Sequence, residues 1–402
     1  MSASASRKFH LSDSTRIYTA RWILPIASAP IEGGWIRINA ERIVDVSSDR
    51  PPIDAIDLGN VAVLPGLVNS HTHLEFSDLS HPIGQPNVPL PTWIGKVVTQ
   101  RGTTTNETKN AAIEAGLRES AEAGVCLIGE ITSPPCNYPV TPQTPAIVSL
   151  AEVLGLSDAR SSERFAAGLL HNEQKENGGW SPHAPYSTTW ATIERCVAES
   201  ARSLRPLAMH VAESPSEREL LSQGTGPFAD ALHAMGVWRD DLFPWGEPPF
   251  DSLIDQLALA HHALLVHGND LRSAELQRIA TYKNLTLVYC PRTHAYFGYA
   301  PHPVAECLTA GIRVALGTDS RASNPDLNLW SEVQFLLNHR PDIDPAEVLK
   351  MATLNGATAL GRLEFGRIQP GCSSAMGTIT TSATTIEGVF EDMAAETYHP
   401  IA

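Results

Sequence analysis

An apolar run that ends in two histidines is the feature that most constrains this chain. Residues 61–68 are mostly Val, Ala and Leu, and they lead through Asn69-Ser70 into His71-Thr72-His73. Side chains alternate faces along a strand, so histidines at positions i and i+2 point the same way. Two imidazoles at one strand end can therefore reach a single metal ion. Alone, the motif fits a pair of hydrogen-bonded loop histidines equally well.

The composition indicates a globular protein without a polyanionic partner. The 402 residues can form one large domain with a smaller companion. The net charge is -15 and no run of Lys or Arg stands out, so we expect no nucleic-acid partner. The polar first residues lack the apolar core of a signal peptide, and no apolar stretch has the length of a membrane span. We therefore expect no membrane partner and a cytoplasmic location.

The cysteines give no sign of a disulfide framework. The six residues are Cys126, Cys136, Cys196, Cys290, Cys307 and Cys372. They lie far apart and form no CxxC pair, which speaks against both a disulfide scaffold and a thiolate zinc site. We expect free thiols in a reducing compartment.

The two ends of the chain have β character. Short strands are expected at 17–26, 35–38 and 42–46, and the tail is rich in Gly, Thr and Ser with a strand candidate at 377–382. Chain ends often lie close together. The sequence therefore predicts a small composite β-sandwich domain built from residues 1–65 and 365–402.

Between these ends, apolar runs alternate with helical stretches. Expected strands are 125–128, 146–150, 207–211, 263–267, 285–290 and 312–317, and expected helices are 106–123, 188–203, 215–224, 271–282 and 302–310. This alternation is typical of a parallel sheet with helices outside it. Seven or eight such units over about 270 residues favour an α/β fold with a closed (β/α)8 TIM-type barrel, which we assign to residues 66–364.

Active residues of such a barrel lie where strands end and enter their loops. The polar residues found there are His71, His73, His183, His210, His267 and Asp319. Three histidines from two strand ends and one aspartate make a nitrogen and oxygen donor set that suits Zn²⁺ or Fe²⁺, with one position left for water.

Each of the remaining positions also has a plainer interpretation. Glu213 in the run His210-Val211-Ala212-Glu213 suits a general base, but it also suits a surface glutamate at a helix N-terminus. A lone histidine such as His267 is often a satisfied core residue, and Asp319 could cap a turn. His261 and His262 compete with His267, which we prefer because it ends the strand.

Several motifs, in order along the chain, resemble the amidohydrolase superfamily. They are residues 65–73, 181–187, 210–213, 316–324 and 352–361, which resemble PGLVNxHTH, xPHAPYT, HxAE, LGTDSxASN and the helix that follows. The resemblance is to the mononuclear deaminase and chlorohydrolase branch. That branch includes deaminases of S-adenosylhomocysteine, guanine, cytosine and aminodeoxyfutalosine, together with triazine hydrolases.

The resemblance implies roles for the strand-end residues. It implies that His71, His73, His210 and Asp319 hold one divalent metal ion, with Zn²⁺ expected first and Fe²⁺ second. Glu213 and His267 would move protons, and Asp319 would also orient the water. A second metal would need a bridging ligand, commonly a modified lysine, and Lys175 in a polar stretch is the only lysine between Lys109 and Lys283.

The implied reaction is hydrolytic deamination of an aminated, purine-like heterocycle, with a small molecule as the partner. His183 would contact the substrate, Trp93 or Tyr186 would form an apolar wall, and Arg101 or Arg292 would meet an anionic group. Three alternatives stay open: hydrolysis of an amide or lactam, displacement of chloride from a heterocycle, and a noncatalytic metal-binding relative. A homodimer is compatible with the resemblance.

Two segments depart from the family pattern. Cys290-Pro291-Arg292-Thr293-His294 stands where relatives often have CPxSN, which leaves the substrate specificity open. Gly371-Cys372-Ser373-Ser374-Ala375-Met376 lacks the acid of the usual GxxADL segment, so we expect a trimmed companion domain.

Overall fold

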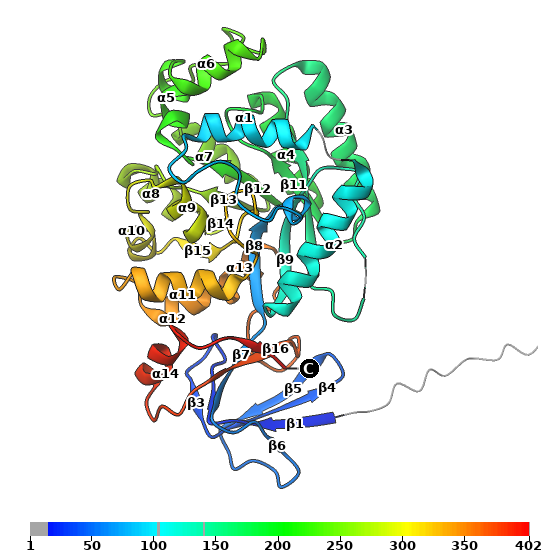
Figure 1. The fold of residues 1–402 in the computed structure, drawn as a ribbon, viewed down its shortest axis with the longest axis vertical. Coiled ribbons are helices and arrows are strands. Elements are labelled where there is room, and N and C mark those ends of the chain that lie inside the picture. The colour runs from blue at the N-terminus through cyan, green and yellow to red at the C-terminus, as the bar shows by residue number, and fades with distance from the viewer. Residues whose placement is uncertain (1–14, 103–104, 140, 402) are drawn as a thin grey trace, which may run out of the picture.

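Eight parallel strands form a barrel that dominates the molecule (Figure 1). The computed structural model describes residues 15–102, 105–139 and 141–401. The barrel strands are β8 (Leu67–Thr72), β9 (Val125–Thr132), β10 (Ala146–Val153), β11 (Gly178–Pro182), β12 (Pro206–Val211), β13 (His262–His267), β14 (Leu285–Tyr289) and β15 (Arg313–Leu316). Each strand pairs with its neighbour in sequence, and a bridge between Thr72 and Asp319 joins the two ends of the sheet. The predicted (β/α)8 fold is confirmed.

Helices lie outside the strands or over their ends. They are η1 (Leu74–Phe76), α1 (Leu90–Arg101), α2 (Asn106–Glu122), α3 (Asp158–Gln174), α4 (Trp190–Ser203), α5 (Pro215–Gln223), α6 (Pro227–Ala234), α7 (Asp251–Leu257), α8 (Ser273–Ala280), α9 (Pro291–Phe297), α10 (Val304–Thr309), α11 (Leu329–His339), α12 (Pro345–Met351) and α13 (Leu354–Ala359). Local chemistry sets their ends. In α5, Ser214 caps the first turn, Pro215 follows, and Gly224 ends the helix in the left-handed conformation.

The interior of the barrel is a packed apolar cluster. It includes Val68, Leu127, Leu150, Ala208, Val266 and Val288, which come from six different strands. Branched side chains that fill a barrel in this way leave the polar residues at the strand ends as the place for chemistry.

Two small sheets at one end of the molecule contain both ends of the described chain (Figure 1). One sheet has the order β5-β4-β1-β6, and the other has the order β17-β16-β7-β2-β3. Their strands are β1 (Thr15–Thr19), β2 (Trp22–Ile23), β3 (Ile31–Glu32), β4 (Trp35–Asn39), β5 (Arg42–Ser47), β6 (Ile56–Asp57), β7 (Val61–Pro65), β16 (Met376–Thr380) and β17 (His399–Pro400). One apolar cluster, with Ile36 from the first sheet and Val63 from the second, joins them. The predicted composite β companion is confirmed, and its boundaries at residues 65 and 365 stay a prediction.

The tail also contains a helix where the sequence analysis expected only β structure. Helix α14 (Ile386–Met393) begins at Thr385, whose hydroxyl accepts a hydrogen bond from Gly388 N. Val389 and Met393 are its buried residues, four positions apart. This spacing places them on one face of a helix, a signal that the Gly/Thr/Ser-rich composition concealed.

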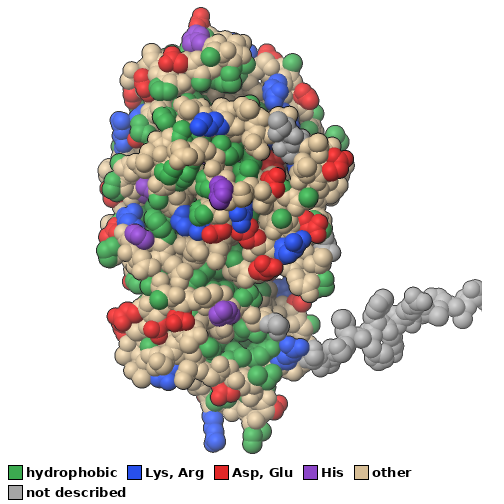
Figure 2. Space-filling model, in the orientation of Figure 1, with side chains coloured by type: hydrophobic (Ala, Val, Ile, Leu, Met, Phe, Trp, Pro, Cys, Tyr) green, Lys and Arg blue, Asp and Glu red, His purple; other side chains and the backbone are tan. Residues whose placement is uncertain are grey.

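None of the helices in the described ranges combines the length and the hydrophobicity that a membrane crossing requires. On the face drawn in Figure 2, basic and acidic side chains are interspersed.

Candidate active site

The first pair of site residues comes from the end of β8. His71 and His73 are both buried, and their ring centroids lie 4.9 Å apart. Glu130 accepts hydrogen bonds from Leu74 N at 3.2 and 3.0 Å, so the backbone directly after His73 is anchored to the next strand. The two imidazoles therefore start from a fixed stretch of chain.

His210 at the end of β12 approaches the same point. Its Nδ1 lies 2.7 Å from the carbonyl oxygen of His183, which can only accept, so Nδ1 carries the proton. That tautomer leaves Nε2 with a free lone pair, the usual arrangement for a metal-binding histidine. Nε2 of His210 lies 3.4 Å from Nε2 of His73.

Asp319 completes the group from the loop after β15. One carboxylate oxygen, Oδ1, lies 3.6 Å from His71 Nε2 and 3.9 Å from His73 Nε2, and Oδ2 accepts a hydrogen bond from Ser323 at 3.0 Å. Burial opposes ionisation, but the neighbouring His71 and His267 side chains keep the pKa of Asp319 below its ordinary value.

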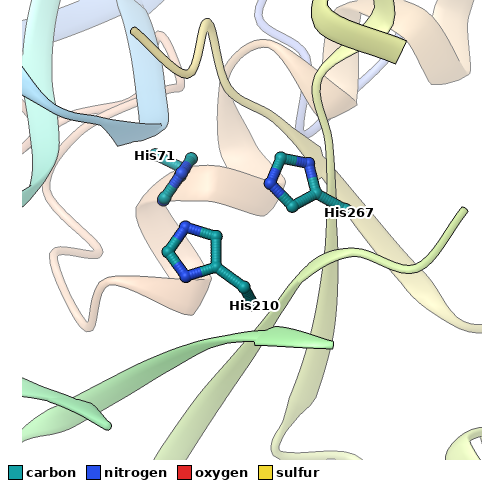
Figure 3. Close-up of side chains that lie close together, drawn as sticks. All are labelled: His71, His210 and His267. Atoms are coloured by element: carbon teal, nitrogen blue, oxygen red, sulfur yellow. The ribbon is translucent and has the colours of Figure 1, made fainter. Parts of the chain in front are cut away.

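The donor set fits a divalent cation. The ligand atoms of His71, His73 and Asp319 lie within 4.8 Å of one another, and the same holds for His71, His210 and His267 (Figure 3). Both ring nitrogens of His71 are buried without a hydrogen-bond partner. Buried polar atoms rarely stay unpaired, and a bound cation would give these nitrogens a partner.

Protonation states favour the same conclusion. Burial, followed by the neighbouring histidines, holds the pKa of His73 and His210 well below the ordinary value for histidine. Their imidazoles are therefore neutral near pH 7, which is the form that binds a metal ion.

Glu213 and His267 form a second pair beside these residues. Glu213 Oε1 lies 3.6 Å from His267 Nε2, and both side chains are buried. Burial, followed by the charges of Asp319 and Glu217, raises the pKa of Glu213 well above its ordinary value. A carboxyl group with a raised pKa can both accept and donate a proton near neutral pH.

Backbone strain is concentrated at this cluster. Ala212, His267 and Asp319 are three of the seven non-glycine residues with positive φ in the described chain, at +52°, +73° and +57°. Such residues are disfavoured unless the surroundings hold them, and they occur often at active sites. Here each of them redirects the chain at the end of a barrel strand.

Two of the predicted substrate contacts lie next to the histidines. The ring of His183 is 4.8 Å from that of His210, and its Nδ1 lies 2.7 Å from Ser187 Oγ. Tyr186 lies 5.8 Å from His183 and stacks on Phe228 of α6 at 4.4 Å. Tyr186 and Phe228 thus make an apolar wall near the ring of His183.

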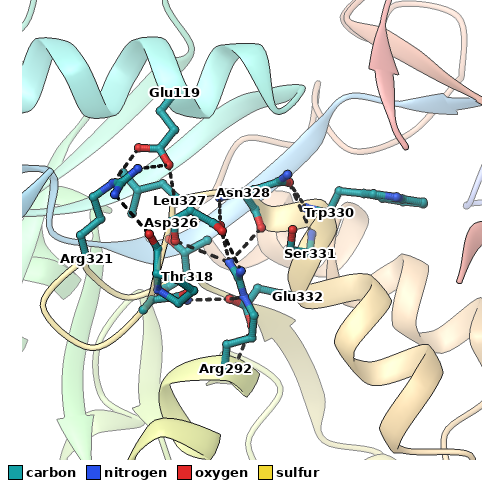
Figure 4. A network of polar contacts seen from close by, with 12 residues as sticks. Glu119, Arg292, Thr318, Arg321, Asp326, Leu327, Asn328, Trp330, Ser331 and Glu332 are labelled. Carbon is teal, nitrogen blue, oxygen red and sulfur yellow. Dashed lines mark hydrogen bonds and ion pairs between the residues drawn. The ribbon is translucent and has the colours of Figure 1, made fainter. Parts of the chain in front are cut away.

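The remaining three predicted contacts are engaged within the protein. Arg101 pairs with the carboxylates of Glu75 and Glu152. Trp93 donates its indole N–H to Ala322 O at 3.2 Å and meets Phe297 edge-on at 5.3 Å. Arg292 donates to Glu332 Oε1 at 2.7 Å and to Asp326 Oδ1 at 2.6 Å (Figure 4). Two carboxylates therefore neutralise the Arg292 guanidinium, and its contact with a substrate anion stays a prediction.

The segment that departs from the family pattern supports Asp319 indirectly. Residues 291–297 form α9, and Thr293 Oγ1 lies 3.0 Å from the Ser323 hydroxyl that donates to Asp319. Sequence reasoning missed this connection because Thr293 lies in α9, whereas Ser323 lies in the loop after β15. The only sequence signal for this contact is that residue 293 carries a hydroxyl group.

Sequence reasoning also missed His302. Its Nε2–H donates to the backbone carbonyl of His267 at 2.8 Å, and its ring stacks on Tyr289 at 3.8 Å. Burial lowers the pKa of His302 to about 3, so the ring stays neutral and keeps one N–H for this bond. His302 thus fixes the backbone of His267, and the sequence contains no motif that indicates this role for His302.

The sequence of this chain is similar to a known family and to several enzymes. The model of the Amidohydrolase family matches residues 62–376. A 5-methylthioadenosine/S-adenosylhomocysteine deaminase of Nitratidesulfovibrio vulgaris is 26% identical over 373 residues, covering 86% of this chain and 77% of that protein. An aminodeoxyfutalosine deaminase of Deinococcus radiodurans is 29% identical over 335 residues, covering 77% and 76%.

Solved structures share the fold. The Helicobacter pylori aminofutalosine deaminase in complex with methylthio-coformycin superposes with a TM-score of 0.83 at 23% identity, covering 96% of this chain and 97% of that one. A triazine hydrolase variant superposes with a TM-score of 0.75 at 19% identity, covering 95% and 91%. The match over residues 62–376 shows that this chain, a hydrolase as predicted, belongs to the amidohydrolase family.

Proposed function

We propose that this chain is a metal-dependent aminohydrolase that releases ammonia from an adenosine-like nucleoside. The observation that carries the proposal is the pair of Glu213 and His267 at 3.6 Å, buried beside a convergent set of His and Asp side chains. A protein that only stored a metal ion would have no need for a proton-carrying carboxyl group at that place. The deaminases among its relatives supply the substrate class.

The proposed ligands are His71, His73, His210 and Asp319, with Zn²⁺ expected before Fe²⁺. When bound, the cation supplies a water molecule with a lowered pKa and withdraws charge from the reacting centre. Nitrogen and oxygen donors of this kind suit both ions.

The side chains around the ligands perform the proton transfers. Glu213 accepts a proton from the attacking water and delivers it to the ring nitrogen next to the carbon that bears the amine. His267 and Asp319 orient the water. The second proton of that water, on the hydroxyl now bonded to carbon, passes to the amine, which leaves as ammonia while the carbonyl forms. The raised pKa of Glu213 suits a group that must accept and release a proton in one cycle.

Three further side chains are proposed to bind the substrate. His183 uses Nδ1 with Ser187, which leaves its other ring nitrogen for the substrate. Tyr186 and Phe228, stacked at 4.4 Å, offer an apolar surface to a flat ring.

The free state of all six cysteines suits a reducing compartment, so we propose a cytoplasmic location.

Ammonia release tests the proposal. The metal-loaded enzyme is incubated with adenosine, 5-methylthioadenosine and S-adenosylhomocysteine, and in parallel with free purine bases, lactams, acyl amides and chlorinated triazines. We expect ammonia from at least one of the nucleosides. Cleavage of an amide or lactam, or release of chloride, without ammonia from any aminated heterocycle would overturn it.

A further inference from the structure

Glu217 is a buried carboxylate that the reaction above does not use. It lies in the first turn of α5 and is 0% exposed. One carboxylate oxygen accepts Ala212 N–H at 3.0 Å and the other accepts Glu213 N–H at 2.8 Å. The adjacent cation, Arg218, pairs instead with Asp270 and Glu275. The principal partners of Glu217 are therefore two consecutive backbone amides.

The conformation of Ala212 explains how one carboxylate can receive both amides. Ala212 has φ +52°, in the left-handed region that alanine seldom adopts. A left-handed residue in a turn can direct successive N–H groups into one concavity that binds an anion. Glu217 supplies the two acceptor oxygens for these amides from within the chain, and its two hydrogen bonds are lost if Ala212 relaxes.

The carbonyl side of the same two residues is fixed by a different loop. Asp270 N donates to Ala212 O at 2.8 Å, and Asn269 Nδ2 donates to Glu213 O at 3.0 Å. Both residues follow His267, so these bonds tie the Glu213 loop to the His267 loop. Glu217 completes the restraint by holding the N–H side.

We propose that Glu217 is a positioning residue that holds Ala212 in its left-handed conformation and thereby aims the Glu213 carboxyl group at His267. Without that conformation the chain would carry Glu213 away from the strand end as helix α5 begins. The inference rests on the proposed function only for the statement that Glu213 moves protons. The geometric part, from Glu217 through Ala212 to Glu213, stands on the structure.

Kinetics with a matched control test the role. Glu217→Gln keeps the size of the side chain but turns one acceptor into a donor that faces an N–H. We expect kcat to fall at least about tenfold while KM and bound metal stay within about twofold of wild type. Glu275→Gln is the control, because Glu275 is also buried in the first turn of a helix and also accepts a backbone N–H, from Arg272 at 2.8 Å. We expect this variant to keep kcat within about twofold.

A double-mutant cycle separates positioning from general damage. If Glu217 acts through Glu213, then Glu217→Gln should change the rate of a Glu213→Gln enzyme by less than about twofold, because the group it positions is already gone. Effects that multiply fully would overturn the inference. If Glu217→Gln fails to fold, Glu217→Asp, which is too short to reach both amides, takes its place in the cycle.

Crystal structures give a readout that does not depend on turnover. In metal-loaded Glu217→Gln we expect Ala212 to leave the left-handed region and the Glu213 carboxyl group to move away from His267. An unchanged Ala212 and an unchanged Glu213–His267 contact would overturn the inference. A wild-type enzyme that releases no ammonia from any nucleoside would instead overturn the proposed function, and this structural readout would still decide the role of Glu217.

Discussion

His210 donates its Nδ1–H to the backbone carbonyl of His183 at 2.7 Å, so the loop that presents one side chain also fixes the tautomer of the other. The bond uses the backbone of His183, which leaves the His183 ring free for a different task. The two histidines can therefore be separated by mutation.

Replacing the His183 side chain should weaken substrate binding without removing the metal ion. In His183→Ala the carbonyl that orients His210 remains, so we expect unchanged metal content and a KM raised about tenfold or more, the effect of losing one or two good hydrogen bonds. Steady-state kinetics and metal analysis on the same preparation check this. Loss of metal from His183→Ala would contradict the separation of roles.

Removing a proposed ligand should lower metal content and activity together. His71→Ala deletes both buried, unpartnered nitrogens of that ring, and Asp319→Ala deletes the carboxylate that lies 3.6 Å from it. Metal per chain is measured by elemental mass spectrometry, with His339→Ala as control because that histidine is exposed on α11. Full occupancy in both ligand variants would remove these residues from the metal site.

Glu213→Gln should separate proton transfer from metal binding. The amide keeps the shape of the side chain but cannot accept a proton, so we expect unchanged metal content and a loss of about 10²-fold or more in kcat. Glu219→Gln, on helix α5 that follows Glu213, is the control, since Glu219 does not contact the site residues named above. Near-normal turnover by Glu213→Gln would show that another group moves the proton.

Acid should destabilise the fold partly through His171. This buried ring lies 2.9 Å from Ser149 Oγ, and burial, followed by Lys175, lowers the pKa of His171 from 6.5 to about 4. Between those values the unfolded chain binds the proton and the folded chain does not, so stability falls as the pH drops from 6.5 to 4. At 1.36 kcal/mol per pKa unit, the upper value of this loss is about 3 kcal/mol.

The measurement compares wild type with His171→Gln. Glutamine can keep a hydrogen bond to Ser149 but does not titrate. Urea unfolding at pH 7 and pH 4.5 should show a smaller drop in the free energy of unfolding for the variant. An equal drop in both proteins would remove His171 from the acid sensitivity.

The barrel was predictable because its strands are short, apolar and bounded by polar strand ends. The expected strand at 263–267 and the observed β13 at His262–His267 differ by one residue. Helix α14 was missed because its segment is surrounded by Gly, Thr and Ser. The helix is also short, and only a few apolar residues mark its buried face. The Gly, Thr and Ser content of the tail indicated β structure, whereas the four-residue spacing of Val389 and Met393 correctly indicates a helix.

The partners of individual side chains could not be predicted in the same way. The chain contains 44 acidic residues, and only the packing of α9 against α11 and the loop before it selects Asp326 and Glu332 as the pair that neutralises Arg292. The role of Glu217 depends on a left-handed φ at Ala212, which no residue type at that position signals. Strand ends can thus be located from sequence, whereas the residues that hold the strand-end side chains in place depend on tertiary contacts.

The bond between the ends of the barrel would give the proposed metal centre a part in assembly. Thr72 Oγ1 donates to Asp319 O at 2.7 Å, and these residues are 247 positions apart in the chain. His71 and His73 leave the ribosome early, but their aspartate partner arrives only with the last strand. A bound cation would therefore stabilise the closed barrel by linking its first and last strands. A nascent or truncated chain that lacks residue 319 would not have this link.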